Sequence, residues 1–293
     1  MAIQQIETIK SVLSVNIKFF IGAVRDSDGV PFPFLLSDAS VDGESITYSV
    51  PRNFPAYDLI QKSPETSLSL NDIESVWRWQ DPKGFQVKGI SKLAGQKFSL
   101  EIFEIYDVIP KAGLDLNIPI YRKKLMWIEK PFYARYSFSK DTKDVPASVY
   151  NEVKNFREKV HSSGFPSFVL TIDPLNGVPN VSPRWITEMD SKSWVFGDGT
   201  RHKTQINAER PCPVSIVFLD PRTNEGYVGV GYVEQSTDPN LKTKTEDYWK
   251  SKGFDVKAIK VNVFHPEEIY RFSRFRWEKI YEGRSRSSWL IKS

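Results

Sequence analysis

The chain repeats itself at a spacing of about 148 residues, and this repeat limits the possible folds more than any single segment does. Asp28-Gly29-Val30-Pro31 matches Asn176-Gly177-Val178-Pro179 at a spacing of 148 (177 − 29 = 148). Further matches keep the same order, most of them at a spacing of 149: 45–48 with 194–197, Arg52 with Arg201, Pro64 with Pro213, Asn71 with Asp220, 85–90 with 226–232, and Ile120-Tyr121-Arg122 plus Trp127 with Ile269-Tyr270-Arg271 plus Trp277. Matches that stay in register predict duplication and divergence.

The repeat sets the domain organisation. A length of 293 residues with 40% hydrophobic residues suits two domains of ordinary size, each with its own core. The polar stretch 139–146 separates the copies, so the sequence predicts one domain at 1–138 and a second at 149–293.

Each copy shows the same order of elements. Apolar residues at helical spacing predict an opening helix around 3–13 and another around 149–160. In the second copy, strands are expected at 168–172, 178–186, 193–196, 214–219, 226–233 and 259–264, with a short helix at 204–208. Short strands between turn signals predict a mainly β protein, with an antiparallel β-barrel in each copy.

Three other segments of the second copy carry expectations of their own. Asp198-Gly199 and Asn224-Glu225-Gly226 are interpreted as hairpin turns. The polar segment 238–254 predicts a helix that either covers a binding site or is simply solvated. The alternation of basic and aromatic residues over 271–277 predicts one strand, which either contacts substrate or closes the barrel.

Charge and composition exclude several classes of function. The formal net charge of +4 comes from 40 basic and 36 acidic residues spread along the chain, so we expect neither nucleic acid nor a membrane surface as a partner. Cys212 is the only cysteine, and the three histidines lack metal-ligand spacing, so no metal site is predicted. Because nowhere do about eighteen apolar residues run together, a cytoplasmic location is expected.

The residues with the clearest chemistry lie at 181–186 and 197–207 of the second copy. Thr200, Arg201, His202, Lys203 and Thr204 precede or begin the expected short helix, and Arg184 can approach from the neighbouring strand. Cations and hydroxyl groups gathered at the start of a helix suit a phosphate dianion, because charge-assisted hydrogen bonds are roughly twice as strong as neutral ones. The alternative is a basic turn exposed to solvent.

These two segments resemble the FMN site of the pyridoxamine 5′-phosphate oxidase-like split barrels. In that family, a strand residue after a Gly-x-Pro hairpin and a Ser/Thr-x-Lys cluster at a short helix hold the flavin phosphate. The resemblance implies FMN as cofactor, with Trp185 beside the flavin. The implied cofactor-binding residues are Ser182, Arg184, Trp185, Ile186, Thr200, Arg201, His202, Lys203, Thr204 and Asn207.

The two copies are not equivalent at this site. At the spacing of 149, Lys203 aligns with Phe54, Thr204 with Pro55 and Arg184 with Leu35. The first copy is therefore expected to have lost the phosphate site. Split barrels of this family usually act as homodimers, so the fused pair resembles a dimer made from one chain, a monomeric pseudo-dimer with one FMN.

The resemblance implies a flavin-dependent oxidoreductase of unknown substrate, acting on a small molecule or accepting electrons from a reduced nicotinamide. The substrate-phosphate contacts of true pyridoxamine 5′-phosphate oxidases are not matched here. Two alternatives remain open: a flavin- or haem-binding sensor or carrier without turnover, and a reductase that uses the deazaflavin F420 on the same fold.

Overall fold

A computed structural model describes residues 2–15, 18–36, 38–72, 84–107, 119–123, 135–138, 143–273, 276–284 and 289–291. By the clustering of its contacts, the chain divides into two compact units. Unit 1 contains 1–133 together with 172–182, and unit 2 contains 134–171 together with 183–293.

The first half of the chain contains two helices and eight strands in its described part. They are α1 (Ala2–Leu13), β1 (Lys18–Arg25), β2 (Pro31–Leu35), β3 (Ala39–Asp42), β4 (Ser45–Tyr48), α2 (Pro55–Lys62), β5 (Glu65–Asp72), β6 (Gly84–Ala94), β7 (Lys97–Asp107) and β8 (Tyr121–Arg122). The predicted opening helix is confirmed as α1.

The second half continues with three helices and ten strands among the described residues. They are β9 (Arg135–Tyr136), α4 (Ala147–Ser162), β10 (Ser167–Ile172), β11 (Pro179–Arg184), β12 (Ile186–Met189), β13 (Trp194–Asp198), α5 (Lys203–Asn207), β14 (Cys212–Asp220), β15 (Glu225–Ser236), α6 (Pro239–Ser251), β16 (Lys260–Ser273), β17 (Arg276–Glu282) and β18 (Leu290–Ile291). The strands β9 and β18 pair with each other.

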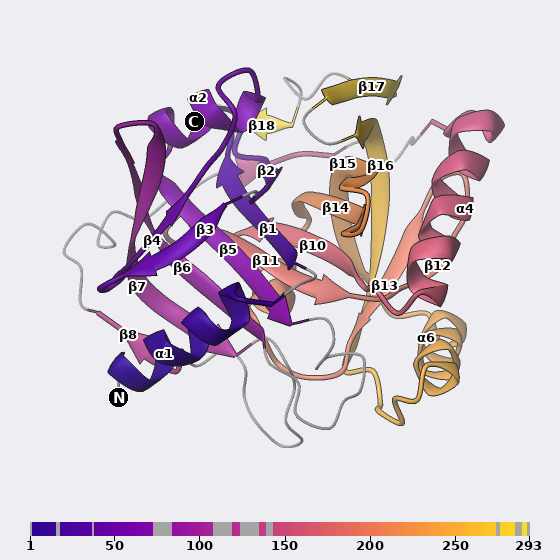
Figure 1. Cartoon of the computed structure of the whole chain (residues 1–293). Helices are drawn as coiled ribbons and strands as arrows, with labels where there is room; N and C mark the ends of the chain where they lie inside the picture. The colour runs from indigo at the N-terminus through magenta and orange to yellow at the C-terminus, as the bar shows by residue number, and fades with distance from the viewer. Residues whose placement is uncertain are drawn as a thin grey trace. The chain divides into compact units, whose positions relative to one another are not determined.

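The two large sheets have the same strand order (Figure 1). The first runs β2-β1-β5-β6-β7-β4-β3, with β8 paired to β7. The second runs β11-β10-β14-β15-β16-β13-β12, with β17 paired to β16. The described pairings between neighbouring strands of both sheets are antiparallel. The predicted fold class is confirmed: the chain is mainly β, in two similar halves of the split-barrel type.

The strand pairing corrects the register of the repeat. His202 immediately precedes α5 and Phe54 immediately precedes α2, which fixes the spacing at 148 (202 − 54 = 148). With the same spacing, Ile46 of β4 aligns in sequence with Trp194 of β13, and both are core residues of their own sheets. The predicted spacing of 149 is therefore wrong here, and a slip of one residue exchanges the two faces of a strand.

A β-bulge lies at the same place in both sheets. In the first it falls between Lys88 and Gly89, and in the second between Val230 and Gly231. A Cβ atom on Gly89 would lie 2.2 Å from the carbonyl oxygen of Glu101, and one on Gly231 would lie 1.9 Å from that of His265. Both bulges therefore require glycine, because the neighbouring backbone leaves no space for a side chain.

The last predicted match of the repeat is wrong. Ile120-Tyr121-Arg122 includes β8, whereas 269–271 lies on β16, which corresponds to β7. The true counterparts are Glu104-Ile105-Tyr106 and Glu268-Ile269-Tyr270 (268 − 104 = 164). The spacing grows because residues 237–259, with α6, replace the short 95–96 turn of the first half. Trp127 lies outside the described residues.

These two Glu-Ile-Tyr segments make the same side-chain contacts. The hydroxyl of Tyr106 donates to the Glu104 carboxylate at 2.7 Å, and Arg122 Nε of β8 donates to it at 2.9 Å. In the second sheet, Tyr270 donates to Glu268 at 2.6 Å. Its cation is Lys279 of β17, whose Nζ lies 3.5 Å from Glu268. Each carboxylate thus joins an added outer strand to its sheet.

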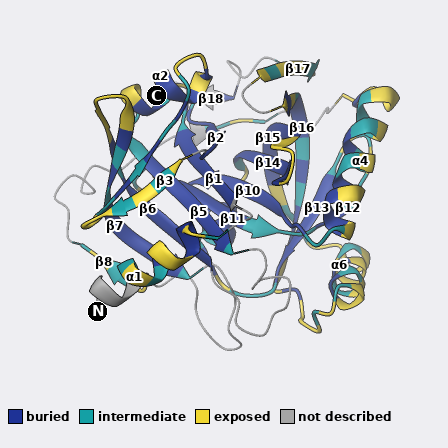
Figure 2. Cartoon of the chain, viewed as in Figure 1, coloured by how far each residue is buried: buried dark blue, intermediate teal, exposed yellow. Residues whose placement is uncertain are grey.

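Most strands of the two large sheets are buried, whereas β3 and β17 are largely exposed, and the helices α4 and α6 each have an exposed face (Figure 2). In the second half, one apolar cluster includes Val153 of α4, Trp194 of β13 and Phe264 of β16. Helix α6 packs on β13 through Thr245 and Trp249, both buried, so it is not simply a solvated helix.

Two other expectations are also wrong. The segment 271–277 is not one strand, because β16 ends at Ser273 and β17 begins at Arg276, and these two residues pair in a hairpin. Asp198 is not a turn residue but the buried last residue of β13. The turn at Asn224 is confirmed; it connects β14 and β15 and has a positive φ of 55°.

Candidate functional site

The predicted site residue Arg184 lies at the end of β11 and turns its guanidinium group into the protein. Its Nε donates to Oδ1 of Asp198 at 3.1 Å, and its Nη1 donates to the carbonyl of Pro183 at 2.5 Å. Its Nη2 contacts both nitrogens of the His202 ring, 2.7 Å from Nδ1 and closer to Nε2. Every nitrogen of the guanidinium group therefore has a contact inside the second half of the chain.

Asp198 is the anionic partner in this group. Its side chain is 0% exposed, and its carboxylate contacts Nε2 of His202 at 2.8 Å and accepts a hydrogen bond from Nδ2 of Asn262 at 2.9 Å. Burial alone would raise the pKa of Asp198, but His202, Arg184 and Asn262 together lower it to about 2. Asp198 is therefore charged at neutral pH and compensates the charge of Arg184.

His202 lies between these two charges and caps α5. Burial lowers its pKa below the ordinary value of 6.5, the charge of Arg184 lowers it further, and Asp198 opposes both effects. A neutral ring fits the contacts when Nε2 carries the hydrogen and donates to Asp198. Nδ1 then accepts from Arg184 and, at 3.4 Å, from the backbone N–H of Gln205.

The other predicted residues of the segment 200–204 differ in exposure. Arg201 is exposed, and Thr200 and Lys203 are half-buried, whereas Thr204 is buried. All four lie within the loop from β13 to α5 or at the start of α5, next to His202 in sequence. The structure thus brings five of the predicted residues, Thr200 to Thr204, into one segment. It also joins Arg184 to that segment through His202.

Asn207 lies in α5 and is buried. Its Nδ2 donates to the hydroxyl of Thr171 at 2.9 Å, while its Oδ1 accepts no hydrogen bond within the described part of the chain. The Oε1 of Gln205, also on α5, is buried without a donor in the same way. Two buried acceptors on one short helix are unusual, because most buried polar groups are hydrogen-bonded.

The remaining predicted residues lie in different surroundings. Ser182 is buried on β11. Ile186 is fully buried in the core, and its carbonyl accepts a hydrogen bond from Arg157 of α4 at 3.3 Å. The Trp185 ring lies edge-on to His161 of α4, with ring centres 4.9 Å apart, and Lys252 lies 5.7 Å above it. Its described contacts are thus with α4, with Tyr248 of α6 and with Lys252, which follows α6.

Sequence reasoning missed Asp198 and Asn262. Asp198 lies four residues before His202 and was interpreted as a turn residue, while Asn262 comes from β16, far along the chain. A carboxylate that immediately precedes a run of basic residues is a usable signal, because a buried cation needs a compensating charge. Nothing in the sequence pattern indicates Asn262.

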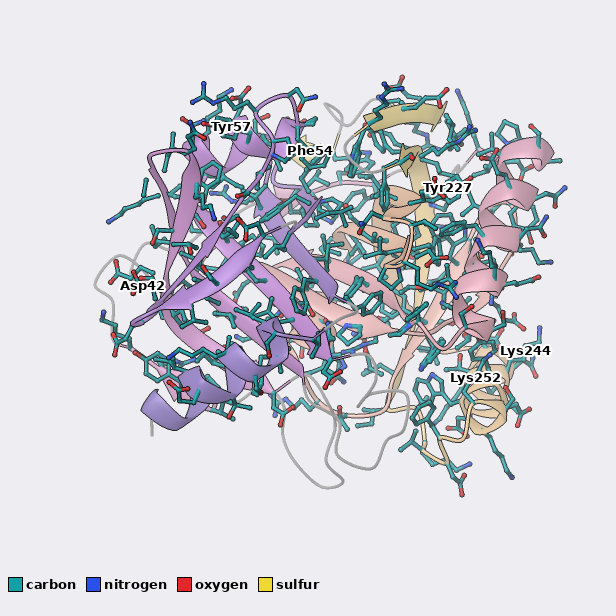
Figure 3. All side chains as sticks on the ribbon, in the orientation of Figure 1. Asp42, Phe54, Tyr57, Tyr227, Lys244 and Lys252 are labelled. Carbon is teal, nitrogen blue, oxygen red and sulfur yellow. The ribbon has the colours of Figure 1, made fainter. Side chains whose placement is uncertain are left out.

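The first half has an apolar counterpart of this group. At the spacing of 148, Arg184, Asp198 and His202 correspond to Leu36, Val50 and Phe54. These three are 7%, 4% and 3% exposed, so they are core residues. Phe54, labelled in Figure 3, precedes α2 where His202 precedes α5. The first half therefore lacks the buried charged group as a whole.

The donor set fits a phosphate group. Arg184 is neutralised by Asp198, so the remaining positive charge comes from Arg201 and Lys203, with the hydroxyl groups of Thr200 and Thr204 beside them. The guanidinium group of Arg184 has five N–H donors, and its described contacts are with Asp198, Pro183 and the ring of His202. The unpaired Oδ1 of Asn207 fits a ligand that carries an N–H donor, which the flavin ring does.

Other kinds of site have less support. Among the residues that the structure describes, no group of three or more histidine, cysteine, aspartate or glutamate side chains is placed to hold a metal ion. No described helix is long and apolar enough to cross a membrane.

No protein-family model and no curated protein matches the chain. Among solved structures it is similar to HupZ of Group A Streptococcus, with 22% identity and a TM-score of 0.37, over 46% of this chain and 98% of that one. A Clostridium acetobutylicum protein related to general stress protein 26, of the pyridoxinephosphate oxidase family, has 19% identity and a TM-score of 0.35, over 44% and 94%. An FMN-binding protein of Syntrophomonas wolfei has 18% identity and a TM-score of 0.32, over 44% and 92%. In each case, nearly the whole of a shorter protein is similar to less than half of this chain.

Proposed function

We propose that the second half of the chain binds FMN and that the protein is a flavin-dependent oxidoreductase. The observation that supports the proposal is the Arg184–Asp198–His202 group, because it is followed directly by Arg201, Lys203 and two threonines. This arrangement gathers cations and hydroxyl groups against a rigid, buried support.

The residues of the proposed site contribute different groups to phosphate binding. Lys203 and Arg201 supply charge that Asp198 does not compensate, and Thr200 and Thr204 supply hydroxyl donors. Arg184 supplies a guanidinium fork whose orientation is fixed by Asp198 and by the carbonyl of Pro183. Bound FMN would supply hydride or single-electron transfer, and the chain would bind and orient it.

Binding is tested by titrating the apoprotein with FMN and following the quenching of flavin fluorescence. We expect about one FMN per chain, because the first half has Leu36, Val50 and Phe54 where the second has its charged group. Lys203→Ala and Arg201→Ala should each weaken binding about 10- to 100-fold, since a hydrogen bond to a charged group contributes about 1.5–3 kcal/mol.

The matched control is Arg52→Ala, in the first half. Arg52 corresponds to Thr200 and is exposed, so its removal should leave the affinity for FMN unchanged. Equal losses in Lys203→Ala and Arg52→Ala would contradict the assignment, as would two equivalent flavins per chain. Uptake of F420 or haem in place of FMN would support the alternative ligands.

Turnover is a separate test. Anaerobic bleaching of the flavin absorbance by NADH or NADPH is expected of an oxidoreductase that accepts electrons from a reduced nicotinamide. A protein that binds FMN tightly but is reduced by neither nicotinamide, and whose reduced flavin passes electrons to no acceptor, would instead be a carrier or a sensor.

A further inference from the structure

The starting observation is the position of His202 between a cation and an anion. His202 is 7% exposed, and its ring is contacted by Arg184 of β11, Asp198 of β13 and the backbone N–H of Gln205 in α5. Nδ2 of Asn262 in β16 donates a hydrogen bond to Oδ2 of Asp198, the oxygen that does not contact His202. Lys203 and Arg201 are its neighbours along the chain.

The contacts leave no room for a second proton on the ring. With Nε2–H donating to Asp198, the other nitrogen, Nδ1, faces the Nη2 of Arg184 at 2.7 Å and the N–H of Gln205, and the same Nη2 also contacts Nε2. A hydrogen on Nδ1 would face two donors and no acceptor. His202 can therefore take a second proton only when Arg184 Nη2 leaves it and an acceptor takes that place.

A phosphate oxygen supplies both conditions. It attracts the Nη2 of Arg184, and it accepts a hydrogen bond from Nδ1–H once the ring is protonated. Without a ligand, the buried group sums to zero charge: Arg184 positive, Asp198 negative, His202 neutral. A proton on His202 adds one positive charge, which a dianion stabilises more than a monoanion does.

We propose that His202 is the specificity-determining residue of this site, selecting a dianionic phosphate monoester over a monoanionic diester by taking up one proton when the ligand binds. This rests on the proposed FMN site. The proton comes from solvent and bonds to Nδ1 of His202. The site thereby gains a cation only when a dianion is present, and a terminal phosphate is preferred to an internal one.

The experiment uses the full chain with FMN and with the methyl phosphodiester of FMN, which keeps the ring and carries one charge fewer. Affinities are measured from about pH 6.5 to 8, where a phosphate monoester is mostly dianionic because its second pKa is near 6. For FMN we expect the affinity to rise up to tenfold for each pH unit lowered, approaching one bound proton. For the diester we expect a clearly smaller slope.

Two variants and one direct readout complete the test. His202→Gln should bind FMN with no such slope, whereas His265→Gln should keep it, because His265 contacts Glu234 instead. With three histidines in the chain, NMR can follow His202 itself, and FMN should raise its pKa. Calorimetry in two buffers should count the proton taken up.

The outcomes separate the two proposals. If FMN binds and the slope is absent, or is unchanged in His202→Gln, the proton-linked selection is wrong and the FMN site stands. Equal slopes for FMN and its methyl diester would also overturn it. If the wild-type chain binds neither ligand, the FMN site and this inference are both wrong.

Discussion

At the scale of single residues, two buried histidines control how stability depends on pH. His161 is 2% exposed, and its ring nitrogens contact Tyr248 at 2.9 Å and Ser167 at 2.8 Å. Burial holds its pKa well below 6.5, and Arg157 and Lys252 add to that effect. His202 has a lowered pKa as well. Both are neutral in the folded chain at neutral pH.

The sign of the pH effect follows. Below pH 6.5 the unfolded chain binds protons that the folded chain does not, so the free energy of unfolding should fall as the pH falls. Each histidine contributes at most about 1.4 kcal/mol per pH unit between its unfolded and folded pKa values. Urea unfolding at pH 7 and pH 5 measures the loss. His161→Gln should reduce the loss. Equal stability at the two pH values would contradict this.

Asp198 acts at lower pH and in the same sense. Its folded pKa of about 2 lies below the ordinary 3.8, so its contribution to stability is complete above pH 3.8 and is lost as the pH falls through about 2. The difference amounts to about 2 kcal/mol. Unfolding of Asp198→Asn should show a weaker dependence on pH between about 4 and 2 than the wild type does.

At the candidate site, the structure shows where the predicted residues lie, and their binding of a cofactor stays a prediction. The basic run 200–204 and Arg184 do lie together, because they are adjacent in sequence or on neighbouring elements. Ile186 was assigned to a ligand, yet its side chain is fully buried in the apolar cluster that also contains Trp194 and Phe196. Asn262 had no signal, because its role depends on the pairing of β13 with β16.

At the scale of elements, the bulges determine which glycines can be changed. Gly231→Ala would place a Cβ atom 1.9 Å from the carbonyl oxygen of His265, so the backbone of β15 or β16 must shift. We expect a loss of about 1–3 kcal/mol. Gly199→Ala is the control, because its Cβ would make ordinary contacts at 3.6 Å and more. Thermal unfolding of both variants measures the difference. Similar melting temperatures would argue against a close-packed bulge.

The wrong spacing of 149 and the wrong match of 120–122 with 269–271 have one cause. The alignment of the two copies rested on similar residue types. Because β-strands share the same few residue types, strands that do not correspond can also match. Ile120-Tyr121 and Ile269-Tyr270 share two residues but lie on strands that do not correspond. Only strand pairing, which fixes the inward and outward faces, could separate a spacing of 148 from one of 149.

At the scale of the whole molecule, the first half serves as a natural comparison for the second. Its Leu36, Val50 and Phe54 show that the fold accepts apolar residues where the second half has charges. The triple variant Arg184→Leu, Asp198→Val, His202→Phe should fold, with stability unchanged or raised by about 1–4 kcal/mol. It should lose FMN binding. Chemical unfolding and FMN titration test both parts.

The single variant Arg184→Ala should behave in the opposite way. It leaves Asp198 buried beside His202 without its cation, which should cost about 3–5 kcal/mol. A triple variant that unfolds more readily than Arg184→Ala would show that the two halves do not tolerate the same core.

The repeat itself was predictable from sequence, and so was the β class. The buried charge was not, because it depends on residues from three strands and a helix.

Helix α6 has a consequence for how such a chain can change over evolutionary time. A Cβ atom on Gly197 would lie 2.5 Å from Thr245 and 2.8 Å from Trp249, so the helix can dock only on a strand that already has glycine at that point. The first half has Ser49 there and a short 95–96 turn in place of the helix. The presence of α6 therefore depends on glycine at position 197, and the need for glycine there depends on α6. A lineage that replaced Gly197 while keeping α6 would have to move or lose the helix, and one that lost α6 would release Gly197 from constraint.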